Sequence, residues 1–569
     1  MKKGFENSSL IFLVFLGLIS LFPPLLMAQG RNQEVTIVAP YQPTISDANK
    51  IDFKPVIKDS LPEIPPMDYA VLQVAPLPQV FTPEPITAVY TEIETTDTLR
   101  RNYLRAGFGN YTTPYAELFT NTLKSDKFSL GFHAKHLSSS GQIDDYATSK
   151  FSQNRVSLFG KRYLRDKTLS GNLFYKRDVV HYYGFKPDDF TGIDISDDDL
   201  KQRFSLIGAE AGLVSNFKRN GILNYSAKAD FYTLSDLYSV NETKVGIGGN
   251  VNSKNEFMDF VDEQELGADG QLDFYQNNDS ILNLGITVLS VQPYLRLKFD
   301  DMNIYLGLRG TLAADSATDF HVYPAINVTF QVIPDYLQFY AGISGGLQRN
   351  SFRSVSDENP WINPIFPLGF TNTKYLFKLG FAGKVDMVLD YNLSVAYADV
   401  EDMLFFANIF SDPLSSAIPD HLGNKFTGIY DDVQHTAVKA ELVWQQSYKL
   451  SFLLAAEYNN YKMENELKPW HKPTFNSKIG AKYQLNSHIS LSGEIFYRSK
   501  VYAKLYEIAP QMFTEVNAFA DLSLGGEYQF NDRISAFLKL NNLSGTQYYR
   551  WYNYPMQRFN AMAGLTFSF

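Results

Sequence analysis

Apolar and polar residues alternate along most of the chain, from about residue 100 to the C-terminus. In the segment HISLSGEIFYRSK, Ile489, Leu491 and Ile495 fall on one face of an extended chain, whereas Ser490 and Glu494 fall on the other. Because side chains alternate across a β-strand, each such segment predicts a strand with one apolar and one polar face. Similar segments recur up to the last one, FNAMAGLTFSF, which ends on Phe569.

Two architectures accommodate a long series of alternating strands. In a soluble sandwich the apolar faces pack inward, whereas in an outer-membrane barrel they face lipid and the lumen is polar. The chain contains 44 Phe and 36 Tyr residues, and aromatic residues gather at segment ends. Such clusters are typical of the aromatic girdles at membrane interfaces. The C-terminal cluster predicted to form part of a girdle is Tyr548, Tyr549, Trp551, Tyr552 and Tyr554.

Short connections alternate with long ones along the predicted strands. The tight turns fall at 164–167, 218–221, 299–302, 333–336, 446–449, 486–488 and 531–533, and the long loops at 179–200, 349–371, 409–423, 463–472 and 501–514. Short turns at one end and long loops at the other are typical of outer-membrane barrels, and a sandwich gives no reason for them.

The strand pattern therefore predicts an all-β fold, a transmembrane antiparallel barrel of about 22 strands over residues 100–569. The first strand begins near Asn102, and the last runs from Met556 to Phe569. The pattern is broken within residues 235–290, where two strands could be gained or lost.

The N-terminal 28 residues have the pattern of a secretory signal peptide. Lys2 and Lys3 precede an apolar stretch, and Ala28 stands at a suitable cleavage point. We expect cleavage and export to the outer membrane, with the mature chain beginning near Gln29. A retained membrane anchor is the alternative.

Residues 29–99 hold 10 of the 26 prolines, which favours extended chain over helices and central strands. This segment is predicted to be an arm that fills the lumen or a flexible leader in the periplasm. The chain has no cysteine and a formal net charge of −10. Disulfides are thereby excluded, and nucleic acid is not an expected partner.

The C-terminal segment LKLNNLSGTQYYRWYNYP, residues 538–555, is followed by a strand that ends in Phe. This combination resembles the last strands of TonB-dependent receptors, which are outer-membrane transporters. The resemblance implies a transport barrel, with lipid and the barrel-assembly machinery as partners. It also implies that the final strand carries the assembly signal, here Phe559, Leu565, Phe567 and Phe569.

The resemblance implies a globular plug domain inside the barrel as well, and here the chain departs from the family. Residues 29–99 are short and rich in proline, so we expect a barrel without that plug, although its lumen is wide enough to need one. The segment QEVTIVAP resembles the short sequence by which these receptors engage TonB, through Glu34, Thr36, Ile37, Val38 and Ala39. TonB, or another outer-membrane or periplasmic protein, is therefore an expected partner.

No enzymatic constellation, metal site or cofactor site is expected. Ser344 lies in a G-x-S-x-G match, but in an alternating strand rather than the strand-to-helix turn that this nucleophile needs. His133 and His136 are three residues apart, which places them on opposite faces of a strand. The acidic segment 188–199 could hold calcium but lacks EF-hand spacing, so a solvated loop is expected.

The loop 356–370 carries three aromatic residues, Trp361, Phe366 and Phe370. They could stack on a ligand or partner, or pack down into the lumen as a lid.

Two functions follow from the sequence. The first is transport or passage of a ligand across the outer membrane, and the alternative is a plugless structural or accessory subunit of an outer-membrane complex.

Overall fold

The computed structural model describes residues 100–569, apart from 123–124, 191–194, 216–222, 280, 282, 316, 387, 410–421, 448 and 506–512. The predicted signal peptide (1–28), arm (29–99) and TonB-binding segment lie outside this part. The described residues form one large antiparallel sheet with 22 strands, and two small hairpins.

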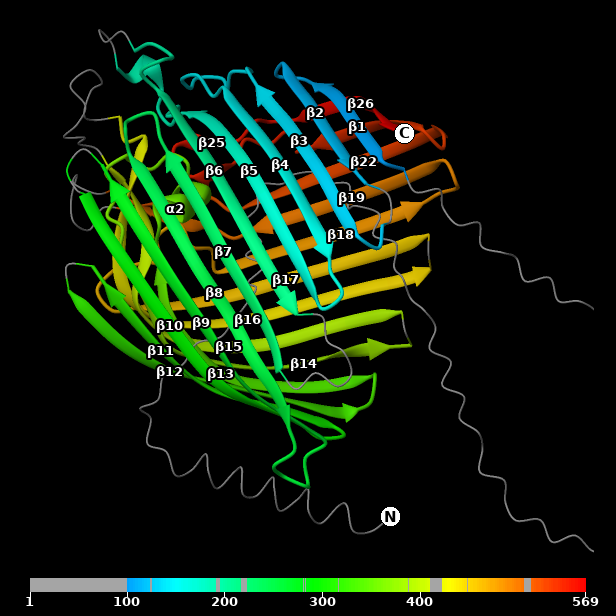
Figure 1. Ribbon diagram of the computed structural model, residues 1–569. Helices are drawn as coiled ribbons and strands as arrows, with labels where there is room; N and C mark the ends of the chain where they lie inside the picture. Colours follow the sequence, from blue (N-terminus) through cyan, green and yellow to red (C-terminus); the bar gives the residue numbers. More distant parts are fainter. Residues whose placement is uncertain are drawn as a thin grey trace, which may run out of the picture. The chain divides into compact units, whose positions relative to one another are not determined.

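The strands of the large sheet run alternately up and down (Figure 1). Their bounds are β1 Asn102–Gly109, β2 Thr113–Asn121, β3 Phe128–Ser139, β4 Phe151–Tyr163, β5 Lys167–His181, β6 Lys201–Ser215, β7 Leu223–Ser235, β8 Asn241–Asn255, β9 Glu263–Asn278, β10 Asn283–Lys298, β11 Met302–Ala314, β12 Thr318–Ile333, β13 Leu337–Arg349, β14 Phe370–Val385, β15 Leu389–Ile409, β16 Lys425–Ser447, β17 Leu450–Met463, β18 Phe475–Gln484, β19 Ile489–Arg498, β22 Phe519–Asn531, β23 Ile534–Asn541 and β26 Asn560–Ser568.

Four strands and two helices lie in the connections. They are β20 Val501–Lys504, β21 Phe513–Val516, β24 Tyr549–Trp551, β25 Tyr554–Pro555, the 3-10 helix η1 Pro187–Asp189 and the α-helix α2 Phe352–Glu358. Among the described residues, neither helix has the length and apolar character needed to cross a membrane.

The first and last strands close the sheet into a barrel. β1 pairs with β2 on one side and with β26 on the other, in a register that joins Leu104 to Phe567 and Phe108 to Ala563. Backbone hydrogen bonds in both directions between Asn102 and Phe569 extend this pairing to the last residue. The predicted barrel of about 22 strands is thus confirmed. The last strand begins at Asn560 rather than Met556, because residues 554–555 pair within a separate hairpin.

The connections differ between the two ends of the barrel. At one end, here called the turn end, β4–β5, β10–β11, β12–β13, β18–β19 and β22–β23 are joined by two to four residues. At the other, the loop end, the longest connections are 182–200, 350–369, 410–424, 499–518 and 542–559. The irregular segment NSKNEFMDFVDEQE, within residues 235–290, neither adds nor removes a strand. It holds the end of β8, a turn and the start of β9.

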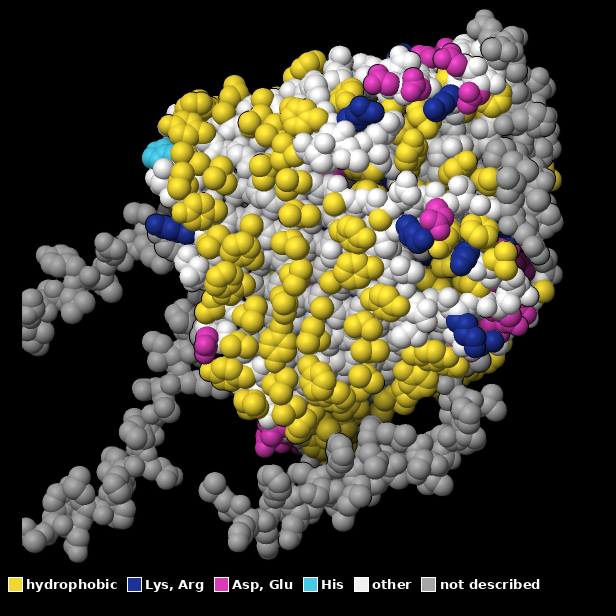
Figure 2. Space-filling view, turned by 180° about the vertical axis from the view of Figure 1, so that it is seen from behind, with side chains coloured by type: hydrophobic (Ala, Val, Ile, Leu, Met, Phe, Trp, Pro, Cys, Tyr) yellow, Lys and Arg dark blue, Asp and Glu magenta, His cyan; other side chains and the backbone are white. Residues whose placement is uncertain are grey.

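The outer wall of the barrel is apolar. On the terminal strand Leu565 is 59% exposed, and on β1 Phe108 is 60% exposed, whereas their neighbours Thr566 and Arg105 are buried on the inward face. Figure 2 shows hydrophobic side chains covering most of the wall, with charged side chains gathered toward its edges. Because water gives no reason to expose such a continuous surface, this wall is suited to lipid.

Candidate functional site

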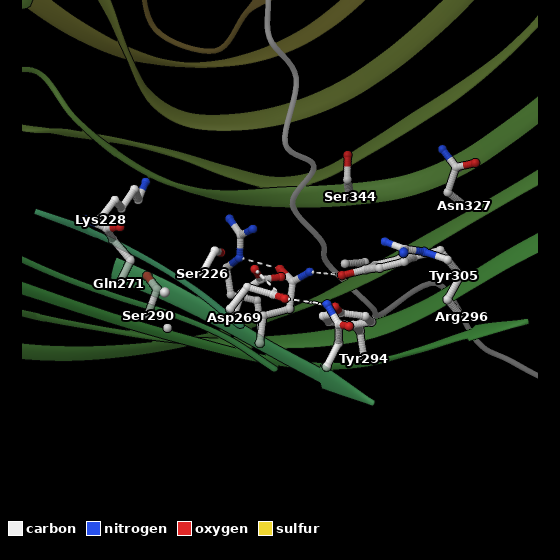
Figure 3. A pocket seen from close by; sticks show the side chains of 18 of the residues that line it. Ser226, Lys228, Asp269, Gln271, Ser290, Tyr294, Arg296, Tyr305, Asn327 and Ser344 are labelled. Carbon is white, nitrogen blue, oxygen red and sulfur yellow. Dashed lines mark hydrogen bonds between the residues drawn. The ribbon is translucent and has the colours of Figure 1, made fainter. Parts of the chain in front are cut away.

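A recess of about 940 Å³ lies in the lumen wall formed by β6 to β14. It is lined by the inward-facing positions of these strands, which are mostly polar or aromatic. Figure 3 shows Lys228, Gln271, Ser290, Asn327 and Ser344 around it. Inward-facing polar residues are expected in a barrel whose apolar residues face outward, because the two sets alternate along each strand.

One part of the recess is an ion-paired cluster. The Nζ atom of Lys244 on β8 lies 2.8 Å from Asp230 Oδ2 on β7 and 3.0 Å from Asp273 Oδ1 on β9. Gln271 donates a hydrogen bond of 2.7 Å to Asp273. These ion pairs and hydrogen bonds give the charged groups of the cluster partners, and they link the neighbouring strands β7, β8 and β9.

A second part of the recess is aromatic. The rings of Tyr294 and Tyr305 stack with centroids 5.1 Å apart, and the guanidinium of Arg296 lies 5.6 Å from the Tyr294 ring. Arg296 also pairs with Glu265 at 2.8 Å, and Gln292 donates to the Tyr305 hydroxyl at 2.6 Å. Fixed rings beside amides and hydroxyls give this wall both stacking surfaces and hydrogen-bonding groups for a polar ligand.

The connections at the loop end pack together into a hydrophobic core, here called the loop cap. Its buried members come from six connections and from the adjoining ends of β6, β7, β15 and β16. They include Ile143, Tyr146, Tyr182, Tyr183, Phe185, Leu200, Phe352, Val355, Ile362, Phe366, Leu422, Trp551 and Tyr554. The loop end of the barrel is therefore a packed structure, which α2 joins from the wall beside β8 (Figure 1).

The predicted girdle role of the C-terminal aromatic cluster is wrong. Trp551 and Tyr554 are buried in the loop cap, at 6% and 0% exposure. The Tyr554 ring stacks on Trp361 with centroids 4.1 Å apart, and its hydroxyl donates to the carbonyl oxygen of Asn424. The tight β24–β25 hairpin turns these rings toward the other loops rather than toward lipid.

The buried carboxylate of Glu242 on β8 holds the first turn of α2. It accepts hydrogen bonds from the backbone N–H groups of Phe352, at 2.6 Å, and Arg353, at 3.1 Å. The Tyr232 hydroxyl and the Asn277 amide donate to the same carboxylate, at 2.9 and 2.8 Å. A single acidic side chain thus joins the barrel wall to the 350–369 loop.

We expect Glu242→Gln to loosen α2, because the glutamine NH2 group that replaces one carboxylate oxygen cannot accept the two hydrogen bonds that this oxygen now accepts. Each buried group left without a partner costs about 1–3 kcal/mol. Hydrogen exchange of residues 352–358 should become faster, whereas Asn241→Asp on the neighbouring exposed position should leave it unchanged. Unchanged exchange in Glu242→Gln would show that this carboxylate is not the anchor.

His471 lies in the connection 464–474 against the loop cap and is 3% exposed. Its ring contacts Trp551 and Phe426, and within the described part of the chain its two ring nitrogens have no hydrogen-bond partner. Burial, together with the nearby cations of Arg498 and Lys472, lowers the pKa of His471 to about 3. The ring is therefore neutral in the closed loop cap.

This histidine predicts a loop cap that opens more readily in acid. An exposed histidine binds a proton below about pH 6.5, whereas the buried ring does so only near pH 3. Between these values the closed form loses about 1.4 kcal/mol per pH unit relative to an opened form. Limited proteolysis of the loops should be faster at pH 5 than at pH 7.5, and His471→Phe should reduce that difference. Equal pH dependence in the variant would contradict this origin.

The other residues singled out in the sequence are placed as follows. Trp361 donates from Nε1 to the carbonyl oxygen of His181 at 3.0 Å, and Phe366 is buried against Phe406, so both lie within the loop cap. Phe370 begins β14 beside the Arg349 guanidinium. Contact of these three residues with a ligand stays a prediction. Phe559, Leu565, Phe567 and Phe569 are all more than a third exposed on the outer face.

The residues considered for catalysis or metal binding do not come together. Ser344 lies within β13, and His133 and His136 bind different strands, through Glu117 at 2.9 Å and Asn154 at 2.7 Å. In the part of segment 188–199 that is described, Asp197 pairs with Lys150, and Asp199 binds Ser196. No group of three or more metal-ligating side chains is found within the described ranges.

Comparison with known proteins finds solved outer-membrane receptors with the same barrel fold. No protein-family model matches the sequence, and a search of curated proteins finds no match. The pyoverdine outer-membrane receptor FpvA from Pseudomonas aeruginosa PAO1, bound to pyoverdine, matches 83% of this chain and 78% of its own, at 14% identity and a TM-score of 0.62. The chain has the fold of TonB-dependent outer-membrane receptors.

Two further receptors share this fold with the chain. The ferric-catecholate import receptor Fiu from Escherichia coli K12 matches 83% of this chain and 82% of its own, at 9% identity and a TM-score of 0.60. The FrpB iron transporter from Neisseria meningitidis gives the same coverage and TM-score at 11% identity. The receptor fold expected from the C-terminal resemblance is thus confirmed.

The receptor-like motif at the C-terminus has a structural role that the sequence did not reveal. Asn542, in the Asn-Asn-Leu run, has a left-handed backbone with φ of 47° and is 2% exposed. Its side-chain amide donates to the carbonyl oxygens of Thr546 and Gln557, at 2.8 and 3.3 Å. Asparagine adopts this conformation more readily than most residues. It therefore ties the two ends of the last long connection, 542–559, together.

Proposed function

We propose that the protein is an outer-membrane barrel that passes a ligand, with the loop cap as its gate. The observation that carries this proposal is a polar and aromatic lumen recess within the receptor fold. The structural neighbours include a ferric-catecholate import receptor and an iron transporter, which favours inward passage. The apolar outer wall favours residence in a bilayer.

The loop cap gives the proposed gate a physical basis. Its aromatic core is assembled from connections far apart in the sequence, and hydrogen bonds join them, as from the Tyr183 hydroxyl to the Pro555 carbonyl oxygen at 2.9 Å. A ligand that enters from the loop end must separate these contacts. Connections drawn from a barrel rim can move together without disturbing the strands, because the strand ladder is complete without them.

The outer-membrane location is tested by fractionation and by gel migration with and without heating. The folded barrel should fractionate with the outer membrane and should migrate differently before and after boiling. Recovery of a soluble periplasmic protein would contradict the proposed outer-membrane location, and with it the proposed function.

A second function is favoured by the loop cap itself. Its packed core gives the loop end of the barrel a well-defined surface. Such a surface suits a structural or accessory subunit that binds another outer-membrane or periplasmic protein. Purification in mild detergent distinguishes the two functions. Repeated recovery of the barrel alone favours passage, whereas a stoichiometric partner favours the accessory function.

TonB remains a candidate partner through residues 34–39, and deletion of these residues should abolish an interaction with purified TonB.

Deletion of Phe569 tests the proposed assembly signal. The residue is exposed on the outer face, and its ring stacks on Phe567 with centroids 4.9 Å apart. Loss of Phe569 should lower the amount of inserted barrel severalfold in fractionated membranes. It removes only the end of the seam, so any barrel that does assemble should be as heat-stable as the wild type. Wild-type levels of inserted barrel would contradict the assembly role.

A further inference from the structure

A row of charged side chains crosses the lumen wall from β1 to β5, away from the recess. Direct cross-strand pairing joins Arg105 to Glu117, Glu117 to Lys135, Lys135 to Arg155 and Arg155 to Lys176. Residues paired in this way point to the same face of a sheet. That face is the lumen, because the alternate positions, such as Leu104 and Val156, are exposed on the outer wall. Four cations and one anion therefore face inward on five adjacent strands.

Within the described residues, the single acid of the row forms no ion pair with the cations beside it. Glu117 Oε2 accepts from the Tyr115 hydroxyl at 2.6 Å, and Oε1 contacts His133 Nε2 at 2.9 Å. At the far end of the row, Lys176 pairs with Asp178 at 3.0 Å and with Asp357 of α2. The positive charge left over is thus concentrated in the middle and at the β1 end of the row.

Three cations of the row have no ion pair within the described part of the chain. Arg105 is only 2% exposed, its guanidinium lies 3.8 Å from the Phe537 ring centroid, and its buried Nε atom has no hydrogen-bond partner. The Nε atom of Arg155 is likewise buried without a partner. The Nζ atom of Lys135 lies 5.7 Å from the centroid of the Tyr115 ring.

This arrangement is costly unless an anion is present. Like charges directly opposite on neighbouring strands repel, and Lys135 and Arg155 are such a pair. A buried guanidinium that lacks a partner also loses its hydration without compensation. Neighbouring strands are about 4.8 Å apart, so long side chains from β1, β3 and β4 can reach one anion between them. Arginine binds carboxylate or phosphate through two parallel N–H groups.

We propose that Arg105, Lys135 and Arg155 form a lumen site for an anionic group, a carboxylate or a phosphate. The site is separate from the recess on β6 to β14, where the Lys244 cluster is already neutralised by carboxylates. It does not depend on ligand passage, because it requires only that the three side chains face the lumen.

The anion has two sources, which share this chemistry. One is a free solute that carries the group. The other is the chain itself, because residues 59–99 contain seven acids and no Lys or Arg: Asp59, Glu63, Asp68, Glu84, Glu92, Glu94 and Asp97. Separate arms of one binding experiment distinguish these sources.

Isothermal titration of inorganic tripolyphosphate into the purified full-length protein in neutral detergent tests the site. We expect one tripolyphosphate per barrel, with binding that weakens as salt is added, and at least a roughly tenfold loss of affinity in Arg155→Gln, the order set by a charge-assisted contact. Lys135→Gln should give a similar loss and serves if the first variant does not fold. Arg177→Gln, next to Lys176 on β5 but on the outer face, is the matched control and should bind as the wild type does.

The second arm uses a chain in which the seven acids of residues 59–99 are changed to Asn or Gln. Tripolyphosphate binding by the wild type identifies a site open to solutes. Binding only by the neutralised chain, and its loss on addition of Arg155→Gln, identifies the chain's own carboxylates as the anion. Absence of binding in both chains, or equal affinity with and without Arg155→Gln, would overturn the proposal. Because this experiment measures only anion binding, its failure is distinguishable from failure of the proposed ligand passage, which conductance in planar bilayers measures.

Discussion

Gly564→Val is expected to prevent closure of the barrel. Gly564 on β26 faces Gly107 on β1 across the closing seam. A Cβ atom at position 564 would overlap the Ala106 carbonyl oxygen and would lie 2.6 Å from both Gly107 Cα and Phe537 Cζ. Two of these three atoms belong to the neighbouring backbone, which cannot move aside without breaking the seam. Overpacking of this kind costs about 3 kcal/mol or more, and here the cost falls on the one contact that makes the sheet a barrel.

The measurement is gel migration before and after heating, with the yield of membrane-inserted protein. Gly564→Val should lose the heat-sensitive folded band and accumulate as unassembled chain. Gly270→Val on β9 is the matched control, because a Cβ atom there meets nothing within 4 Å. A normal folded band in Gly564→Val, or an equal loss in the control, would contradict this explanation of the seam.

Tyr554→Ala is expected to open the loop cap while the barrel stays intact. The Tyr554 side chain is fully buried, stacks on Trp361, and meets the Tyr183 ring edge-on with centroids 4.9 Å apart. Removal of a buried aromatic side chain costs about 3–5 kcal/mol. The cost should fall on the loop cap, because the barrel strands keep their own backbone ladder.

Limited proteolysis and hydrogen exchange measure this opening. Cleavage within 182–200 and 350–369 should become at least tenfold faster in Tyr554→Ala, with the heat-sensitive folded band retained. Phe320→Ala replaces an aromatic side chain that is 66% exposed on β12, and it should behave as the wild type. Unchanged loop protection in Tyr554→Ala would show that the aromatic core does not hold the loops together.

The barrel could be predicted from the sequence because its information is local. Alternation within single strands, as from Ile489 to Arg498, defines the two faces, and short polar turns mark the strand ends. The closing role of the strand that ends at Phe569 followed from the same alternation. The break in the alternation near residue 255 is also local, because it is a single seven-residue turn between β8 and β9.

The loop cap could not be predicted, because its contacts join residues far apart in the chain. Trp361 and Tyr554 stack across nearly two hundred residues, and nothing near either residue indicates its partner. Tyr554 follows a strand and resembles an interfacial aromatic in sequence, but the hairpin geometry turns it inward. Glu242 stands among polar residues with no local signal of burial. The polar lining of the recess was easier to predict than the loop cap, because its residues, such as Ser344, occupy the polar faces of predicted strands.

The conductance of purified full-length protein in planar bilayers shows most directly whether the loop cap closes a barrel built for passage. We expect a nearly silent wild type and conductance steps several times larger in Tyr554→Ala, with Phe320→Ala as silent as the wild type. A Tyr554→Ala barrel that is as silent as the wild type, or a wild type that already conducts as fully as the variant, would contradict this expectation.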